Sequence, residues 1–505
     1  MGVLKRIILI LCTVSMLISS LLSSLFLLPA LVFAGTCWNG GQDGSAPWYV
    51  KSSSGQDSVE YDDVNYCVNT VAASGDTVNL PAGSVTWGNT LTITKGVTLQ
   101  GAGMDSTTVT SSGGTIIVAY IPANPSLNES FRLTGVTLDG NGRSVIGVYV
   151  GNSSTSDTIT NIRLDHNKIH GCANKCFQPI GMIYGLIDNN IFMGDSGVVG
   201  KPIMILSGNN DYSWEQPVNI GTADSLYIED NTFSGTTEGW YIIQSNEGTR
   251  WVFRNNTADM SNGGQPLDVH GNQATNYSDI PISCLNSSVL YNNARSGVIT
   301  EVYGNTFTNQ PTSARIFQAR GGQTFVWNNN SSGPNANQPF FVMWEEDASL
   351  LAYGPCSPLK TDYPGLDPLI AYAWENNFTK VGYSTSRAYI QYNDVPSLEA
   401  QAIMIPEQIG YWADTQRGST TATSYWRSGL HSGRNLSACT TGNVYWETDN
   451  KKLYRCTATN TWTFIYQPYT YPHPLRGTNK GATIINTVGG LNAIDIVGGL
   501  NVINQ

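Results

Sequence analysis

Six residues in the middle of the chain could together perform acid–base chemistry on a charged sugar. They are Arg250, Arg254, Asp268, His270, Glu301 and Arg320. Cleavage of a uronate-containing polysaccharide by β-elimination needs a cation beside the sugar carboxylate, a base for the C5 proton and an acid for the leaving oxygen. The set offers all three kinds of group in a sequence in which only 12% of the residues are charged. We therefore take it as the candidate catalytic set of a polysaccharide lyase.

The same residues allow two other interpretations. A glycoside hydrolase needs two carboxylates that flank the scissile bond, and Asp268 and Glu301 are the candidate pair. In a purely structural interpretation, Arg and Glu side chains on neighbouring strands form surface ion pairs, and His270 satisfies a backbone carbonyl. The set is richer in arginine than in carboxylate pairs, which favours a lyase over a hydrolase.

Aromatic side chains near this set are candidates for stacking against sugar rings. The chain has 13 Trp and 25 Tyr, and many of them must pack in the core or in loops. The preferred substrate-binding candidates are Trp240, Tyr303 and Trp327. Trp240 follows the repeat that contains Glu229, and the other two are expected to point outward near the arginines.

A repeat built on asparagine indicates which elements position these side chains. Its Asn residues are Asn167, Asn190, Asn231, Asn256, Asn305 and Asn329. The gaps between them are 23, 41, 25, 49 and 24 residues, which are one or two multiples of a unit slightly above 20. Three positions before each Asn the residue is apolar: Leu164, Ile187, Ile228, Phe253, Val302 and Val326. Such a repeat predicts a solenoid with an apolar interior and a stack of amides at one turn.

The residue that follows each apolar position should point outward, because side chains alternate along a strand. The outward column is Asp165, Asp188, Glu229, Arg254, Tyr303 and Trp327. Stacked carboxylates repel each other, so the three acidic members either face water or share Ca²⁺, and a solvated face is the preferred interpretation. No other cofactor is expected.

The N-terminal part of the repeat region shows how the solenoid begins. Residues 59–73 place Val64, Cys67, Val68 and Val71 on one helical face, and residues 76–103 then give the first short strands. With the asparagine repeat, this pattern resembles the pectate-lyase-like superfamily of right-handed parallel β-helices, in an uncharacterised secreted branch. The resemblance covers about residues 59–395 and is specific for the fold rather than the reaction. It implies an all-β solenoid with an N-terminal capping helix. Because pectate lyases of this family use Ca²⁺, it also makes Ca²⁺ a possible cofactor here.

The remaining segments give the expected domain organisation. We expect a signal peptide at 1–34, an N-terminal extension at 35–58, the parallel β-helix at 59–395 and a linker at 396–438. A small disulfide-closed β-hairpin module follows at 439–475, and a C-terminal repeat tail at 476–505. An uncleaved membrane anchor is the alternative for the first segment, because its apolar run is long for a signal peptide.

Eight cysteines follow the signal peptide, and an even number in a secreted chain indicates disulfides. Their connectivity is open, but proximity in the sequence suggests the pairs Cys172–Cys176 and Cys439–Cys456. The spacing supplies no four neighbouring ligands for zinc.

Composition narrows the partners. A net charge of −11 argues against nucleic acid and against an anionic membrane surface. The sequence thus predicts a secreted, monomeric, polysaccharide-active β-helix, with a lyase favoured. The rival hypothesis is a non-enzymatic surface protein or adhesin whose aromatics bind glycans. Convergence of the catalytic set in one groove would favour the enzyme, and scattered placement the adhesin.

Overall fold

The structure is a computed structural model that describes part of the chain. That part comprises residues 36–39, 47–152, 156–194, 202–235, 241–261, 266–269, 297–309, 316–319, 322–333, 341–343, 370–380, 390–392, 408, 411–415, 421–477, 496–497 and 500–501. The expected signal peptide lies outside it. Within it, no helix is both long and apolar enough to cross a membrane.

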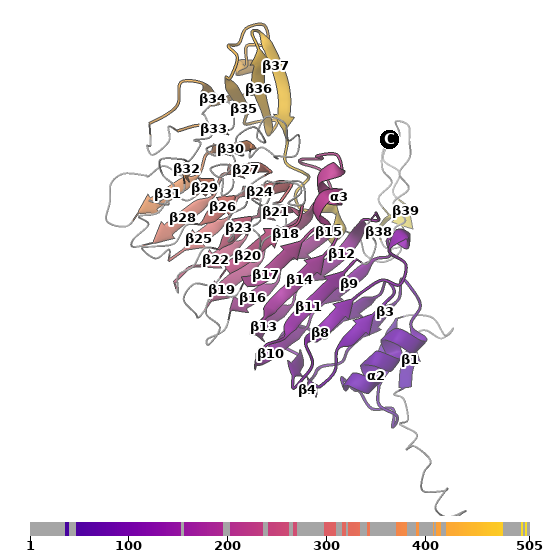
Figure 1. The fold of residues 1–505 in the computed structure, drawn as a ribbon. Helices are drawn as coiled ribbons and strands as arrows, with labels where there is room; N and C mark the ends of the chain where they lie inside the picture. Colours follow the sequence, from indigo (N-terminus) through magenta and orange to yellow (C-terminus); the bar gives the residue numbers. More distant parts are fainter. Residues whose placement is uncertain are drawn as a thin grey trace, which may run out of the picture.

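Three long sheets, named here A, B and C, form the body of the molecule (Figure 1). Sheet A consists of β1 (Thr36–Asn39), β2 (Trp48–Lys51), β3 (Thr77–Asn79), β6 (Thr98–Gln100), β9 (Phe131–Thr134), β12 (Ile159–Asp165), β15 (Ile183–Asp188), β18 (Leu226–Glu229), β21 (Arg250–Arg254), β24 (Ile299–Tyr303), β27 (Gln323–Trp327), β30 (Ile370–Trp374) and β33 (Tyr411–Ala413). Sheet B consists of β4 (Gly83–Trp87), β7 (Thr107–Ser111), β10 (Thr137–Arg143), β13 (Lys168–Cys172), β16 (Ile191–Gly194), β19 (Thr232–Gly235), β22 (Thr257–Asp259), β25 (Thr306–Thr308), β28 (Asn330–Gly333) and β31 (Asn377–Lys380). Sheet C consists of β5 (Leu91–Ile93), β8 (Ile116–Tyr120), β11 (Ile146–Gly151), β14 (Lys175–Ile180), β17 (Pro202–Ser207), β20 (Tyr241–Asn246), β23 (Leu267–Val269), β26 (Phe317–Ala319), β29 (Phe341–Met343) and β32 (Ile390–Tyr392).

The chain visits the sheets in the order A, B, C and then returns to A one strand further along. Strands of successive coils pair in parallel, for example β21 with β24 and β24 with β27. Among the described strands of these three sheets, the one antiparallel pair is β1 with β2. These pairings confirm the predicted parallel β-helix.

The apolar half of the repeat forms the interior. All six predicted inward residues, from Leu164 to Val326, are completely buried in one continuous core. The outward direction of their neighbours on sheet A follows from the same alternation.

The asparagine half of the repeat forms a ladder at the turn between sheets A and B. The amide oxygen of Asn305 accepts from both the backbone nitrogen (2.9 Å) and the Nδ2 (3.1 Å) of Asn256, and each neighbouring pair repeats this pattern. Asn376 adds a further rung below Asn329. The left-handed backbone belongs to the residue before each Asn, such as Asn255 with φ 56°. The ladder satisfies the polar groups of the turn within the protein.

A helical segment covers the N-terminal end of the core, as predicted. It consists of α2 (Tyr61–Tyr66) and a π-helical continuation, Cys67–Val71, and it buries Val64, Cys67 and Val68. A disulfide between Cys37 and Cys67 ties β1 to this cap. The cap closes an otherwise exposed end of the core.

The predicted disulfide between Cys172 and Cys176 is wrong. The Sγ of Cys172, at the end of β13 in sheet B, lies 3.3 Å from the carbonyl oxygen of His170. The Sγ of buried Cys176, in β14 of sheet C, lies 3.9 Å from the carbonyl oxygen of Met193. Proximity in the sequence misled here, because a turn places the two cysteines in different sheets.

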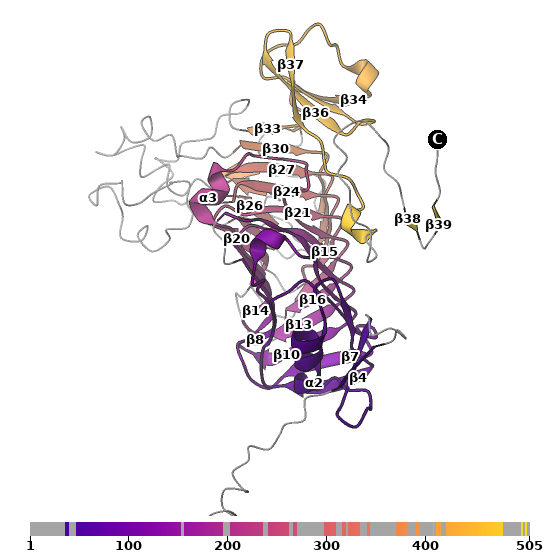
Figure 2. The same ribbon diagram turned by 90° about the vertical axis from the view of Figure 1, so that its right-hand side faces the viewer.

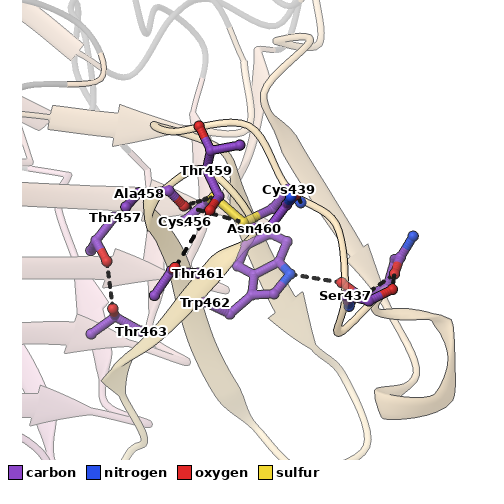
Figure 3. Close-up of a disulfide and its surroundings, with 11 residues drawn as sticks. Ser437, Cys439, Cys456, Thr457, Ala458, Thr459, Asn460, Thr461, Trp462 and Thr463 are labelled. Atoms are coloured by element: carbon purple, nitrogen blue, oxygen red, sulfur yellow. Dashed lines mark hydrogen bonds between the residues drawn. A yellow bond between two sulfur atoms is a disulfide. The ribbon is translucent and has the colours of Figure 1, made fainter.

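A C-terminal module follows the last strand of sheet A (Figure 2). Its sheet contains β34 (Trp426–Gly429), β35 (Val444–Glu447), β36 (Lys452–Ala458) and β37 (Thr461–Tyr466). It thus begins at Trp426, within the segment predicted to be a linker. The predicted disulfide Cys439–Cys456 is confirmed, and Figure 3 shows it beside Trp462. In the tail, β38 (Ile496–Val497) and β39 (Leu500–Asn501) pair antiparallel.

Short helices complete the fold. They are α3 (Asn210–Glu215), between β17 and β18, and the 3₁₀ turns Pro125–Leu127, His431–Gly433 and Pro474–Arg476. Of these, α3 contacts Arg250, and the last turn lies against sheet A.

Candidate functional site

Most of the predicted site lies on the outer face of sheet A, and other segments of the chain cover this face. Its outward residues form two registered columns. The first is Arg163, Leu186, Tyr227, Val252, Glu301, Phe325, Tyr372 and Trp412, and the second is Asp165, Asp188, Glu229, Arg254, Tyr303, Trp327 and Trp374. Every member is buried. The C-terminal module and the segment after β37 (residues 467–477), here called the strap, contact this face.

Aromatic rings fill the half of this face nearest the module. Trp327 stacks on Trp374 with 5.5 Å between ring centroids, and Trp446 of the module packs against both. Phe325 stacks on Tyr466 at 4.4 Å. These residues belong to a second hydrophobic core, outside the solenoid.

The stacking candidates Tyr303 and Trp327 belong to this second core. Their rings stack on each other at 4.6 Å, and their exposed fractions are 5% and 6%. A ring that already packs against another ring has no free face for a sugar. We therefore assign both residues a packing role.

Ionic contacts fill the other half of the face. Arg254 is completely buried, and its Nε donates to Glu229 Oε2 at 2.6 Å. Its Nη1 donates to the Tyr303 hydroxyl and the Tyr469 carbonyl, and its Nη2 donates to the Thr470 carbonyl, each at 2.9 Å. Burial alone would lower the pKa of the Arg254 guanidinium, but these contacts raise it above its usual value. Arg254 therefore joins the strap to sheet A.

The acidic column also binds arginines. Asp165 accepts two hydrogen bonds from Arg132, and Asp188 likewise accepts two from Arg163. Arg476 of the strap lies 2.8 Å from Glu229 and also contacts Asp230. Burial would raise the pKa of Asp165, but the hydrogen bonds from Arg132 help to lower it.

The preferred interpretation of the acidic column as a solvated face is therefore wrong. Asp165, Asp188 and Glu229 are each completely buried, and arginines supply the compensating positive charge. Among the described residues, no group of three His, Cys, Asp or Glu side chains is arranged to hold a metal ion. Arginines thus supply the positive charge for which shared Ca²⁺ was the alternative.

Glu301 lies between the aromatic and the ionic halves. Its Oε2 accepts from the Tyr466 hydroxyl at 2.6 Å, and its Oε1 accepts from the Gly221 backbone nitrogen at 3.1 Å. Burial raises the pKa of this carboxyl to about 7, although both bonds and nearby Arg254 oppose the shift. Glu301 thus faces the module rather than an open groove.

Arg250 lies apart from this network, at the start of β21. Its Nη1 donates to the Pro217 carbonyl at 2.7 Å, and its Nη2 donates to the carbonyls of Ser213 (2.7 Å) and Gln216 (3.1 Å). These carbonyls come from α3 and the residues that follow it. Arg250 therefore holds α3 at the corner between sheets C and A.

Asp268 lies on a different face, sheet C. The outward residues there form one registered row: Tyr149, Gln178, Ile205, Gln244, Asp268 and Gln318. The row is rich in amides, and Asp268 is its only charged member. Asp268 and Gln318 are 3% and 1% exposed, whereas Gln178 and Gln244 are half-buried. Lys175 adds a cation beside the row, because its Nζ lies 3.3 Å from Gln178 Oε1.

The longest segments between strands of the three sheets join sheet C to sheet A. Two residues, Asn255 and Asn256, join β21 of sheet A to β22 of sheet B. By contrast, residues 208–225 join β17 to β18, and residues 270–298 join β23 to β24. Long connections on a rigid scaffold are where binding and catalytic residues concentrate.

Trp240, His270 and Arg320 lie outside the described residues. Of the others, the structure brings Arg254, Glu301, Tyr303 and Trp327 together under the module and strap. It places Arg250 at the sheet C–sheet A corner and Asp268 on sheet C. The described members of the catalytic set thus occupy three locations rather than one groove.

Sequence reasoning missed the strap. Tyr469, His473 and Arg476 of the strap contact the outer face of sheet A, as does Tyr466 at the end of β37. Burial lowers the pKa of His473 to about 3, and the charges of nearby arginines add to the shift. The change of the outward column from carboxylates to aromatics after Glu229 was the available signal.

Comparisons with known proteins give the fold rather than a reaction. No family model matches the sequence, and no curated protein matches it. Among solved structures, the Azotobacter vinelandii mannuronan C-5 epimerase AlgE6 A-module is similar at 17% identity and a TM-score of 0.41, over 71% of this chain and 90% of that one. An alginate lyase from Paenibacillus sp. str. FPU-7 is similar at 11% identity and a TM-score of 0.39, over 66% and 95%. Geobacillus virus E2 ORF18 is similar at 12% identity and a TM-score of 0.38, over 81% and 84%. Such low values transfer no activity, substrate or residue role. The fold itself, a parallel β-helix, rests on the strand pairing.

Proposed function

We propose that this protein is an extracellular polysaccharide-binding β-helix whose ligand lies along the outward face of sheet C. One observation carries the proposal: the amide-rich row from Gln178 to Gln318 runs across successive strands of sheet C, and Gln178 and Gln244 within it are partly exposed. Extracellular location is part of the proposal, and the disulfides Cys37–Cys67 and Cys439–Cys456 support it.

The chemistry of the row suits a sugar chain. An amide side chain both donates and accepts hydrogen bonds, as a pair of neighbouring sugar hydroxyls does. Side chains on adjacent strands repeat about every 4.8 Å, so an extended polymer meets the same kind of group several times. Because a β-helix is rigid, little ordering of the protein opposes binding.

Sheet A is a poorer candidate for the ligand face. Its outward columns are buried, and ligand access would require the strap and module to leave the second core. Large aromatic contacts and buried ion pairs oppose that release. On sheet C, by contrast, Gln178 and Gln244 are partly exposed, so a ligand can reach this part of the row without such a step.

Cleavage by β-elimination is the second candidate function, and Asp268 favours it. Asp268 is a nearly buried carboxylate within the row, and it pairs with Gln318 of the next strand. Val269 pairs with Ala319, and the next residues in the sequence are His270 and Arg320. These two and Asp268 supply a base, a cation and an acid, which is the set that a lyase needs.

Affinity electrophoresis in gels containing pectate, alginate or a neutral glucan tests the binding proposal. We expect retardation of the wild type in at least one gel, and weaker retardation of Gln244→Ala. Thr257→Ala, on the exposed face of sheet B, is the matched control and should behave as the wild type. Equal retardation of all three proteins would contradict the placement on sheet C.

Ultraviolet absorbance during incubation with the retained polymer tests cleavage. A lyase produces an unsaturated product that absorbs, and the increase should disappear in Asp268→Asn and His270→Ala. No increase with a polymer that the wild type binds would reject β-elimination and leave the binding proposal standing.

A further inference from the structure

Two aromatic rings on the N-terminal hairpin, β1 and β2, remain in water. Trp38 of β1 is 62% exposed, and Tyr49 of β2 is 41% exposed. The two residues are direct partners in the antiparallel β1–β2 pair, so their rings lie side by side on one face of the hairpin. The hairpin lies at the opposite end of the β-helix from the C-terminal module (Figure 1). Neighbouring apolar rings that stay exposed mark a candidate interaction surface.

These rings belong to the same outward face that the module covers further along the chain. Under the module, Tyr303 and Trp327 of this face are only 5% and 6% exposed. The face thus carries buried rings at one end and uncovered rings at the other. Successive strand partners join the two ends: Tyr49 with Asn79, Asn79 with Gln100, Gln100 with Thr134, and Thr134 with Asp165 of the acidic column.

The base of the hairpin is fixed. A disulfide joins Cys37 to Cys67 of the cap, and Val50 is completely buried in the core of the β-helix. The Nε1 of Trp48 donates to an Asp76 carboxylate oxygen at 2.7 Å. The two exposed rings are therefore presented on a rigid support, and little ordering of the backbone opposes binding to them.

Amide side chains continue the outward row beyond the rings. Asn79 is half-buried and Gln100 is exposed. The Nδ2 of Asn79 donates to the Trp48 carbonyl at 3.1 Å, which orients this amide beside the Tyr49 ring. We call Trp38, Tyr49, Asn79 and Gln100 the hairpin row. It extends over three strand spacings, about 14 Å.

The hairpin row carries no uncompensated charge at its described borders. Lys51 pairs with Asp57, and its Nζ lies 6.0 Å from the centroid of the Trp38 ring. At the other end of the row, Arg132 pairs with Asp165 at 2.6 Å. The row therefore offers apolar rings and neutral hydrogen-bonding groups, which complement an uncharged ligand rather than an ionic one.

We propose that the hairpin row binds a neutral sugar chain, at a site separate from sheet C. A pyranose has an apolar C–H face that can stack on Trp38 and Tyr49, and hydroxyls that amides such as Asn79 and Gln100 can bind. A lipid surface would suit the rings but would not use the amides. The inference goes beyond the proposed function, because it adds a second site on another face and assigns it an uncharged ligand.

Isothermal titration of the full-length protein with cellohexaose, mannohexaose and xylohexaose tests the proposal, with hexagalacturonate as the acidic probe. We expect at least one neutral hexasaccharide to bind, and Trp38→Ala to weaken this binding about tenfold through loss of one stacked ring. Phe464→Ala is the matched control, because Phe464 is 52% exposed on the C-terminal module and lies outside the row. Binding of no neutral probe, or equal binding by wild type and Trp38→Ala, would overturn the inference.

A second variant examines the amide part of the row. Gln100→Ala removes an exposed amide and leaves both rings in place. We expect it to weaken binding of the same hexasaccharide about threefold, as for the loss of one hydrogen bond. Full affinity in both Gln100→Ala and Tyr49→Ala would mean that Trp38 acts alone, and would refute the row.

Other occupants of the rings give different results. Sedimentation with vesicles of phosphatidylcholine and phosphatidylglycerol that is lost in Trp38→Ala, without sugar binding, would assign the rings to a membrane surface and overturn the proposal. A dimer in gel filtration that is lost in Trp38→Ala, again without sugar binding, would assign them to a second copy of the chain and overturn it equally.

The hairpin row and the sheet C proposal fail separately. Gln244→Ala should bind the neutral hexasaccharide as the wild type does, because Gln244 lies on sheet C. Weaker binding in Gln244→Ala, with Trp38→Ala unchanged, would support sheet C and refute the hairpin row. The opposite result, together with unchanged retardation of Gln244→Ala in every polysaccharide gel, would support the hairpin row and refute binding along sheet C.

Discussion

The outer faces of sheets A and B are built on the same coils, yet one is covered and the other is open. Three residues after buried Glu229, Arg254 and Tyr303 come exposed Thr232, Thr257 and Thr306. The backbone ladders are equivalent, since both sheets pair in parallel and share the asparagine turn. The side chains differ: sheet A presents large aromatics, arginines and carboxylates, and sheet B presents small polar groups at these positions.

This contrast shows how side-chain size and charge select a covered face. Aromatic rings on sheet A remove apolar area from water only if something packs on them, and the module does so. The ion pairs of the same column then find partners in the strap. Exposed hydroxyl groups on sheet B can hydrogen-bond to solvent, so they need no cover. A row of charged residues on a solenoid therefore does not by itself indicate a catalytic groove.

The largest effect should come from the second core. Trp446→Ala removes a completely buried ring that contacts Trp327 and Trp374. We expect a loss of about 3–5 kcal/mol in the stability of the docked module, measured by denaturant unfolding with Trp fluorescence. Thr306→Val on sheet B should stay within about 0.5 kcal/mol of the wild type. Similar losses in both variants would remove the distinction between the faces.

The ionic half should respond almost as strongly. Arg254→Met leaves the Glu229 carboxylate and two strap carbonyls without this donor, at an expected cost of about 3–5 kcal/mol. Adding Glu229→Gln should recover part of that loss, because the unpaired buried charge disappears. A double-variant cycle by denaturant unfolding measures this coupling, and strict additivity would argue against the described network.

Glu301 should make docking of the module dependent on pH. Its pKa is raised from 4.5 to about 7, so its contribution to stability is fully present below about pH 4.5 and is lost as the pH rises through about 7. Glu301→Gln resembles the protonated form and should remove this loss, which is on the order of 3 kcal/mol. Unfolding midpoints between pH 5 and pH 8 would show it, and parallel curves for wild type and variant would contradict it.

His473 should have the opposite pH dependence. Its pKa is lowered from 6.5 to about 3, so the stability that it contributes is present above about pH 6.5 and is lost as the pH falls toward 3. His473→Gln should flatten the acidic side of the pH–stability curve and leave the neutral side unchanged. The same unfolding series, extended to pH 3.5, provides the measurement.

The smallest of these effects should come from the turn that both faces share. Asn256→Ala interrupts the amide ladder between Asn231 and Asn305, with an expected cost of about 1–3 kcal/mol. Asn330→Ala, at an exposed position of sheet B, is its control and should cost less than about 0.5 kcal/mol. An equal cost for the two variants would mean that the ladder contributes no more than a surface amide.

The sequence predicted the repeating parts of this molecule because their signals are local and periodic. An apolar residue recurs three positions before each Asn of the repeat, as Phe253 does before Asn256. This pattern indicated the core and the turn together. The cover over Arg254 could not be predicted in the same way, because its contacts come from Tyr469 and Thr470, more than 200 residues later. No spacing rule links segments so far apart. Cys172 and Cys176 show the opposite error, in which neighbours in the sequence were assumed to be neighbours at the sulfur atoms.

The central claim is that a glycan uses sheet C, while sheet A belongs to the module and sheet B stays unoccupied. Affinity electrophoresis of three single variants tests it most directly: Gln244→Ala on sheet C, Thr257→Ala on sheet B and Tyr471→Ala on the strap over sheet A, where Tyr471 is half exposed. The account predicts weaker retardation by the retained polysaccharide for Gln244→Ala alone. Weaker retardation of Tyr471→Ala or Thr257→Ala, with Gln244→Ala unchanged, would contradict it.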